Sequence, residues 1–579
     1  MFVRVNTVRS EGGTYEYLRL VETYREGGQP RQRVLANLGR LDVLRAQGKI
    51  DALIRKLRRF SDEVVVTGRE LEESQAPTWG PVLVARHLWN ELSLSETIRA
   101  CCSKGRKQFD VVETAFVLAS ARLAHPSSEH GLARWLDEAY VCDAKGRRWL
   151  PQWRPCEKVT AEDRVRVESR QLVIWYRTLD ALVSQKKAIE AALYLRLRDL
   201  FSIKVDLVFY DLTSLYFEGH GPLGLAKRGY SRDGKPRNPQ IVLGVVMANG
   251  FPIASHIFPG NTLDKQTVQE VVKDLEKRFG IRQILFVGDR GMVSKENIQC
   301  IADSGYRYLV GLQRRRNPEV WQVLLNLKGR WEDCGCGTKV QEVRLMDSEL
   351  RYFVATSEER LQYERDIRLG NMTAAREALE KIKKAVAKGE LRDAAKIGKR
   401  VGRAFSRTKG YRYFSWEVTK TGEFRFWEDA EKMAKEEGYE GKYILKTTDR
   451  NITAYHAVEA YKDLGDVEWA FREIKDIIEG RPIWHQKEER VQGHVFVGML
   501  SLLLMRVLRK SLKEKDVYLS SQEAFTALKT IEVYQLEVEG EQHRIVPRPR
   551  GDALRVLKAL GIRKLEPPMP PRNAPERVM

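Results

Sequence analysis

The chain has few of the features that mark secreted or zinc-stabilised proteins. Its 579 residues include seven cysteines, an odd number that contains no CxxC pair. This pattern argues against a disulfide framework and favours a reducing compartment, so we expect a cytoplasmic protein. No group of His or Cys lies at zinc-finger spacing beside Cys101 and Cys102 or beside the C-x-C of Cys334 and Cys336. We therefore expect no structural zinc site.

Long apolar runs are also missing. The first residues, MFVRVNTVRS, lack an apolar core of signal-peptide length. The longest apolar stretch, Val495 to Met505, is too short to cross a bilayer. We expect that stretch to be a buried helix, and we expect no membrane partner.

Acidic residues are outnumbered. There are 79 Asp and Glu against 100 Lys and Arg, which gives a net charge of +21 and a pI near 9.5. Such a charge suits a partner rich in phosphate, although a merely soluble basic protein is the simpler alternative. The length is too great for one hydrophobic core and predicts about three or four domains.

The periodicity of apolar residues changes along the chain and divides it into six segments. Alternation around glycine-rich turns predicts a small antiparallel sheet first, followed by a basic helix near Val43 to Phe60. The charged, Pro-rich tail from Pro567 is expected to be disordered. The segments are residues 1–75 (sheet and helix), 76–200 (helical domain), 201–312 (first part of an α/β core), 313–438 (insertion with strands and basic helices), 439–512 (second part of the core) and 513–579 (C-terminal region).

The core segment begins with three strand patterns. The second and third flank Asn249-Gly250, a dipeptide suited to a type I′ turn, and helical and strand patterns alternate afterwards. This is the element order of a ribonuclease-H-like fold. The predicted fold class is therefore α/β, with a ribonuclease-H-like core interrupted by a mixed α/β insertion and preceded by a small β-rich segment and a helical domain.

Three acidic residues occupy recognisable local settings: Asp211 in FYDLTSLYF, Asp289 in ILFVGDRGM and Glu468 in VEWAFREIK. Each aspartate follows an apolar, β-branched run, as when a buried strand delivers a polar group at its C-terminal end. Glu468 lies in a segment of helical composition. Carboxylate oxygens suit Mg²⁺, with Mn²⁺ as a substitute, and two such ions about 3.5 to 4 Å apart support phosphodiester chemistry.

The chain resembles the DDE transposases of the insertion-sequence-4 superfamily, most closely the 1634 group, from MFVRV to about Lys510. Tyr461, Glu468 and Lys475 match the Tyr, Arg, Glu, Lys signature of that family, and Leu464 stands where the signature has arginine. The resemblance implies that Asp211, Asp289 and Glu468 are the catalytic metal ligands for two Mg²⁺ ions.

The same resemblance implies an insertion-sequence transposase. Such an enzyme binds terminal inverted repeats in double-stranded DNA, cuts at the ends of the element and joins the 3′-OH to target DNA. Residues 1–75 and 76–200 are then candidates for binding DNA, the second of them for binding the element's ends. Relatives act as homodimers in a synaptic complex, and some release the element through a DNA hairpin. The protein would be associated with the nucleoid when bound to DNA.

Helical spacing predicts that Tyr461, Glu468, Arg472 and Lys475 share one stripe, with the carboxylate and the cations pointing the same way. Tyr461, Arg472 and Lys475 are then predicted to contact DNA, and Arg472 could replace the missing signature arginine. The alternative is a solvated helix face with an i, i+4 pair of Glu and Arg. Glu473 is the competing acid, and it should face away from the stripe.

Further predicted contacts each have a plain alternative. Cations in the stretch 227–240 could clamp cleaved DNA or lie in a solvated loop, and polar residues near strand ends could bond a phosphate or merely form turns and caps. The basic run QRRRNP and the basic helices of the insertion could contact the element's end or be solvated. The residues are Lys227, Arg228, Lys235, Arg237 and Arg290 (DNA), Thr213, Ser214, Asn261 and Asp264 (secondary), and Arg314 and Arg315 in QRRRNP.

Two other functions compete with transposition. A ribonuclease-H-like nuclease without strand transfer would use the same acids, but the large N-terminal half suits sequence-specific end binding better than general cleavage. A catalytically silent DNA-binding regulator is disfavoured because all three acids are present.

Overall fold

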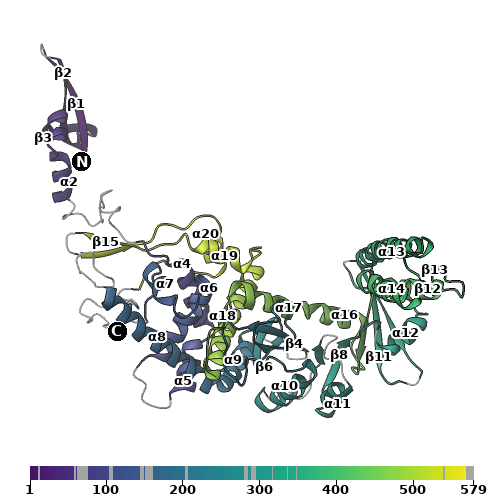
Figure 1. Cartoon of the computed structure of the whole chain (residues 1–579). Helices are drawn as coiled ribbons and strands as arrows, with labels where there is room; N and C mark the ends of the chain where they lie inside the picture. Colours follow the sequence, from purple (N-terminus) through teal and green to yellow (C-terminus); the bar gives the residue numbers. More distant parts are fainter. Residues whose placement is uncertain are drawn as a thin grey trace. The chain divides into compact units, whose positions relative to one another are not determined.

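The chain forms two compact units, Met1–Ala76 with Tyr534–Ile545 and Pro77–Val533 with Val546–Met579. The computed structural model (Figure 1) describes residues 1–10, 13–57, 60, 76–103, 109–143, 146, 149, 161–201, 207–279, 285–288, 295–315, 317–335, 337–346, 348–538 and 541–568. Most of the Pro-rich tail expected to be disordered lies outside these residues.

The first unit is built on a three-stranded antiparallel sheet. Gly27 and Gly28 turn the chain between its last two strands at φ values of 59° and 83°, which favour glycine. The single basic helix predicted after the sheet is wrong, because Gly48 at φ 61° splits it in two. The elements are β1 (Phe2–Ser10), β2 (Gly13–Glu26), β3 (Gln29–Arg40), α1 (Leu41–Ala46), α2 (Lys49–Leu57), β15 (Tyr534–Val538) and β16 (Glu541–Ile545).

The second unit begins with the predicted helical segment. α6 is buried along its whole length, and Asp110 caps it by accepting hydrogen bonds from the backbone N–H groups of Val112 and Glu113. The helices are α4 (Gly80–Glu91), α5 (Leu94–Cys102), α6 (Val111–Ala124), α7 (Leu132–Glu138), α8 (Ala161–Ser184) and α9 (Lys186–Phe201).

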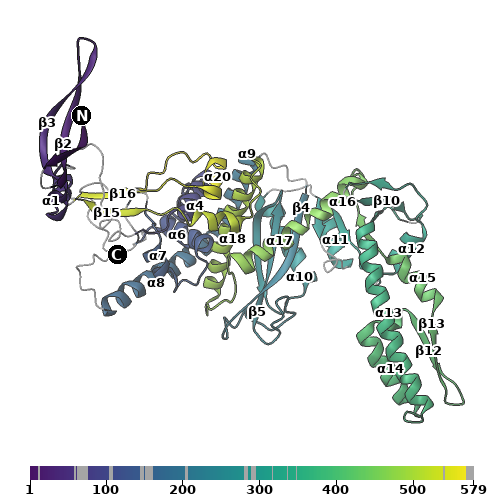
Figure 2. The ribbon, with the colours of Figure 1, turned by 90° about the horizontal axis from the view of Figure 1, so that it is seen from above.

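A helix from much later in the sequence completes this bundle. α18 (Glu488–Glu514) packs against α6 and α8 (Figure 2), and the Ser501 hydroxyl donates to the Ala119 carbonyl. By length and composition α18 could cross a membrane, but 94% of its most apolar window is buried inside the protein. The prediction of a buried helix at this stretch is confirmed.

A mixed sheet of nine strands forms the centre of the second unit, in the order β6-β5-β4-β7-β8-β14-β11-β10-β9. β4, β5 and β6 pair antiparallel, whereas β4, β7 and β8 run parallel. Asn249 and Gly250 both have positive φ, as a type I′ turn requires, so the predicted hairpin is confirmed. The strands are β4 (Leu207–Tyr216), β5 (Gln240–Ala248), β6 (Phe251–Pro259), β7 (Leu285–Gly288), β8 (Arg307–Gly311), β9 (Glu332–Asp333), β10 (Thr338–Arg344), β11 (Arg351–Ser357) and β14 (Lys442–Thr447).

Helices cover both faces of the sheet. Val208 and Tyr210 of β4 share a buried cluster with Val271 and Leu275 of α10 (Asp264–Phe279). The alternate residues of β4 belong to the other cluster, which includes α17 (Gly465–Arg472) and α18. α11 (Lys295–Asp303) contacts α10 and β8.

The predicted insertion is divided between two structures. Its strands β9, β10 and β11 extend the central sheet through β14, so they do not form a separate domain. The remainder has a hydrophobic cluster of its own, which contains Leu379, Val401 and Phe424. Its elements are α13 (Glu358–Ala387), α14 (Ala394–Thr408), β12 (Phe414–Val418) and β13 (Phe424–Glu428). Further helices of the unit are α12 (Pro318–Leu325), α15 (Ala430–Tyr439), α16 (Ala454–Asp463), α19 (Ser521–Leu528) and α20 (Gly551–Ala559).

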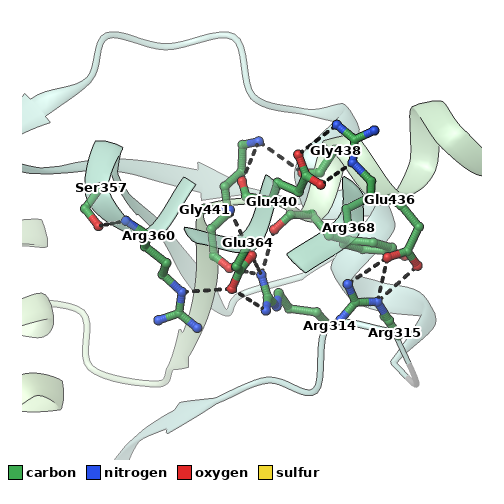
Figure 3. Close-up of polar contacts among 12 residues, drawn as sticks. Arg314, Arg315, Ser357, Arg360, Glu364, Arg368, Glu436, Gly438, Glu440 and Gly441 are labelled. Carbon is green, nitrogen blue, oxygen red and sulfur yellow. Dashed lines mark hydrogen bonds and ion pairs between the residues drawn. The ribbon is translucent and has the colours of Figure 1, made fainter. Parts of the chain in front are cut away.

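Ion pairs join the loop after β8 to α13 and α15 (Figure 3). The Arg314 guanidinium lies 2.7 Å from a carboxylate oxygen of Glu364 on α13, and Arg315 lies equally close to Glu436 of α15. The side chain of Arg314 is only 10% exposed. The fold therefore supplies acidic partners for both arginines, and their contact with the element's end stays a prediction.

Candidate active site

Asp211 lies within β4 and not at its end, since the strand continues to Tyr216. What ends at this point is the parallel pairing with β7, whose last pair is Tyr210 with Gly288. Asp211 itself pairs with Val245 of β5 and is half-buried, and its Oδ1 accepts a hydrogen bond from the backbone N–H of Leu212. Asp211 thus lies at the position where β4 loses its parallel neighbour β7 and keeps only its antiparallel neighbour β5.

The second predicted acid and its neighbour, Asp289 and Arg290, lie outside the described residues. The strand that precedes them is present as predicted. β7 is fully buried and ends at Gly288, the residue directly before Asp289.

The third predicted acid, Glu468, is on α17. Phe209 and Leu215 belong to the face of β4 that carries Asp211, because side chains alternate along a strand. They share a buried cluster with Val467 and Phe471 of α17, and α17 contacts β4. Glu468 follows Val467 and is exposed. The fold therefore brings the helix of Glu468 to the side of the sheet on which Asp211 lies.

The predicted stripe of four side chains is only partly exposed. Glu468 and Arg472 share the exposed side of α17, and the Arg472 guanidinium lies 4.6 Å from the centre of the Trp469 ring. Tyr461, on α16 (Ala454–Asp463), instead stacks on Tyr443 of β14 with ring centres 5.8 Å apart.

Lys475 lies in a π turn at the end of the helix. Residues Glu473–Ile477 form a π turn, in which the Ile478 N–H donates to the Glu473 carbonyl. Regular α-helical spacing therefore does not extend to Lys475. Its ammonium lies 2.7 Å from Asp233, and the two side chains are 11% and 3% exposed.

Glu473 faces away from Glu468, as predicted. Its side chain is buried, with a carboxylate oxygen 2.8 Å from the Arg506 guanidinium of α18. Burial raises the pKa of Glu473, although Arg506 opposes the shift. Arg506 also donates to the backbone carbonyl of Asp466, so it holds both ends of α17. This acid has a structural partner, whereas Glu468 is exposed.

The basic stretch 227–240 is a folded loop. The Ser214 hydroxyl accepts a hydrogen bond from the Arg232 N–H, and the Gln240 side chain donates to the Tyr230 carbonyl. The chain passes so close to the turn after β6 that a Cβ on Gly229 would lie 2.0 Å from the Gly260 carbonyl oxygen. Four predicted DNA contacts are exposed on this loop: Lys227, Arg228, Lys235 and Arg237.

The remaining predicted positions are less informative. Thr213 is buried in β4, and Ser214 anchors the loop. Asn261 is exposed in the turn after β6. Asp264 is the first residue of α10, and the structure does not describe its side chain.

Sequence reasoning missed Asp233, the residue that ties the basic loop to the π turn after α17. It is the one acid in the stretch 227–240. It pairs with Lys475 and, at 3.5 Å, with Arg481, which also pairs with the exposed Asp476. A lone acid in a basic run is a signal that could have indicated a distant cationic partner.

We expect Asp233→Ala to open this loop. The substitution leaves the buried Lys475 without its partner, a loss that costs about 3–5 kcal/mol in comparable buried pairs. Trypsin should then cut after Arg237 at least about tenfold faster in the native protein, because cleavage follows the open population. Asp476→Ala is the matched control, since it removes a carboxylate from Arg481 at the surface. Equal cleavage rates in the two variants would show that Asp233 does not hold the loop.

One cluster among the described residues has His and carboxylate atoms close enough together to hold a metal: Glu129, His485 and His494. Arg122 already supplies a cation there, 3.2 Å from Glu129 and 3.0 Å from His494. Burial alone would raise the pKa of Glu129, but the two histidines and Arg122 hold it well below its usual range. Contacts among these four side chains therefore join the helical bundle to the segment after the π turn, and the positive charge of Arg122 balances the negative charge of Glu129.

Comparison with known proteins gives two family matches. Residues 3–72 match the model described as IS1634 family transposase, N-terminal domain. Residues 206–504, more than half of the chain, match the model described as Transposase DDE domain. No curated protein matches the chain.

Among solved structures, the cryo-EM structure of a piggyBac transposase synaptic complex with hairpin DNA is similar at 11% sequence identity. The similarity covers 79% of this chain and 82% of that chain, with a TM-score of 0.34.

Proposed function

Because the chain belongs to the IS1634 group of DDE transposases, we propose that it binds the terminal inverted repeats of an insertion sequence, cuts the DNA at their ends and joins the 3′-OH to target DNA. Members of this family use divalent metal ions. For this chain we assign the ligands to Asp211, Asp289 and Glu468, and the metal to two Mg²⁺ ions, for which Mn²⁺ can substitute.

The observation that carries the assignment is the register of β4 and β7. These neighbouring parallel strands pair Tyr210 with Gly288, and the next residues in the sequence are Asp211 and Asp289. α17, which bears Glu468, packs on the face of β4 that carries Asp211. The strand order β6-β5-β4-β7-β8 is also the order that the ribonuclease-H-like prediction requires.

The donor set fits hard divalent cations, because all three groups are carboxylates. When bound, two such ions supply activation of a water or a 3′-OH and stabilisation of the leaving oxygen. The chain's own residues would position the DNA. Arg472, on the exposed side of α17 with Glu468, would contact a phosphate, and Arg290 would contribute a further cation.

The exposed cations of the loop 227–240 would hold the backbone of the cleaved strand beside this site. Tyr461 and Lys475 would support the site from protein contacts, because they face Tyr443 and Asp233. We further propose a homodimer in the synaptic complex and a cytoplasmic protein that associates with the nucleoid on DNA.

The test is cleavage and joining of a labelled duplex that carries the element's terminal repeat. With Mg²⁺, the wild-type protein should cut at the repeat end and form strand-transfer product, and EDTA should abolish both reactions. A duplex with a scrambled repeat is the control, and it should not be cut at a defined position. Cleavage without joining would favour the nuclease, and specific binding without cleavage in Mg²⁺ or Mn²⁺ would favour the regulator.

A further inference from the structure

All the charged residues of α14 are basic. Its 15 residues, Ala394–Thr408, contain five Lys or Arg and no Asp or Glu. Asp393, directly before the helix, caps it by accepting a hydrogen bond from the Lys396 N–H, so its charge is directed at the backbone. The five cations, all exposed, are Lys396, Lys399, Arg400, Arg403 and Arg407.

These cations form one narrow face. At about 100° per residue they fall within a stripe roughly 100° wide that extends for about 16 Å along the helix. The opposite face buries Ile397, Val401 and Phe405 in the hydrophobic cluster that includes α13 and β12–β13. Figure 2 shows α13 and α14 side by side. The stripe, which we call the α14 basic face, is therefore held on a packed helix and points away from the cluster.

Two neighbouring arginines in the same substructure have acidic partners. Arg376 of α13 pairs with Glu428 of β13, and Arg425 pairs with Glu423 in the hairpin. Within the described part of the chain, none of the five α14 cations makes an ion pair. Like charges three and four residues apart on a helix repel and destabilise it by a few tenths of a kcal/mol each. An external polyanion would relieve that repulsion.

We propose that the α14 basic face binds the phosphate backbone of double-stranded DNA. This inference rests on the proposed function and adds a contact surface outside the catalytic site. Phosphate contacts carry no base information, so the face would bind DNA of any sequence. α14, whose residues are all described, exposes no aromatic ring on which bases of a single strand could stack, and this favours duplex DNA over single strands.

The experiment measures the salt dependence of binding by the full chain to a fluorescent duplex that lacks the terminal repeat. Each phosphate contact contributes about 0.9 to the slope of log K against log salt. Replacing Lys399 and Arg403 by Gln should reduce the magnitude of that slope by about 2. The matched control is Lys381→Gln with Lys384→Gln, which removes the same charge from exposed positions of α13, and it should leave the slope unchanged.

Three outcomes would overturn the inference. Identical slopes for the α14 variant and the wild type would show that α14 makes no phosphate contact. Equal reductions of the slope in the α13 and α14 variants would show an effect of net charge and not of the α14 basic face. Competition by double-stranded RNA that is stronger than competition by duplex DNA would assign the face to another partner. Failure of the wild type to cut the terminal repeat would count against the proposed function alone, because the slope does not depend on cleavage.

Discussion

Asp211→Asn and Glu468→Gln should each abolish DNA cleavage while leaving DNA binding intact. Both substitutions keep the size of the side chain and remove the negative charge that a divalent cation requires. We expect cleavage of the terminal-repeat duplex to fall by about 10³-fold or more, at least as much as the loss of one electrostatic contact to a transition state. Gel-shift affinity for the same duplex in the absence of metal should stay within about twofold.

Two other acids of the same helical segment provide the controls. Asp463→Asn changes an exposed carboxylate one residue before the α16–α17 junction and should leave cleavage unchanged. Glu473→Gln tests the competing acid. Loss of cleavage in Glu473→Gln, with an intact fold and with activity retained in Glu468→Gln, would transfer the catalytic role to Glu473. Retained activity in Asp211→Asn would remove the metal site from β4 altogether.

The elements that the sequence predicted well are those specified by local chemistry. Runs of apolar and β-branched residues located β4, β5 and β6, and Asn249-Gly250 located the turn between the last two, because positive φ at both positions is a local requirement. The helical pattern around Glu468 and the buried stretch in α18 follow the same reasoning. These signals need no knowledge of distant partners.

The features that were missed depend on contacts between distant segments. Nothing in the sequence near Glu473 marks a π turn, and nothing there indicates that Lys475 pairs with Asp233, 242 residues away. QRRRNP is a basic run in sequence, but the fold places Glu364 and Glu436 against Arg314 and Arg315. A basic run in the sequence therefore predicts unpaired, exposed cations only where the fold places no acidic side chain against it. α14 is such a case.

Arg506→Leu should strongly destabilise the segment that carries Glu468. It leaves Glu473 as an unpaired buried carboxylate and frees the Asp466 carbonyl. Breaking a buried pair from one side costs about 3–5 kcal/mol of unfolding free energy. Hydrogen exchange should show faster opening of α17, and the melting temperature should fall. Lys510→Leu is the control on the same helix, because its partner Glu514 is 57% exposed and such pairs contribute about 0–1 kcal/mol.

The destabilisation should also depend on pH in a defined direction. The pKa of Glu473 is raised in the folded protein by burial, and losing Arg506, which opposes that shift, raises it further. A carboxyl group whose pKa is higher in the folded state than in the unfolded state binds more protons when folded, so stability falls as pH rises through the interval between the two values. The loss of stability in Arg506→Leu should thus be largest at neutral pH and shrink as the pH is lowered towards the ordinary pKa of a glutamate.

Adding Glu473→Leu to Arg506→Leu removes the unpaired charge and should restore much of the stability at pH 7. If the single and double variants melt alike at every pH, the buried pair does not fix α17, and the position of Glu468 must depend on the apolar contacts of Val467 and Phe471 alone.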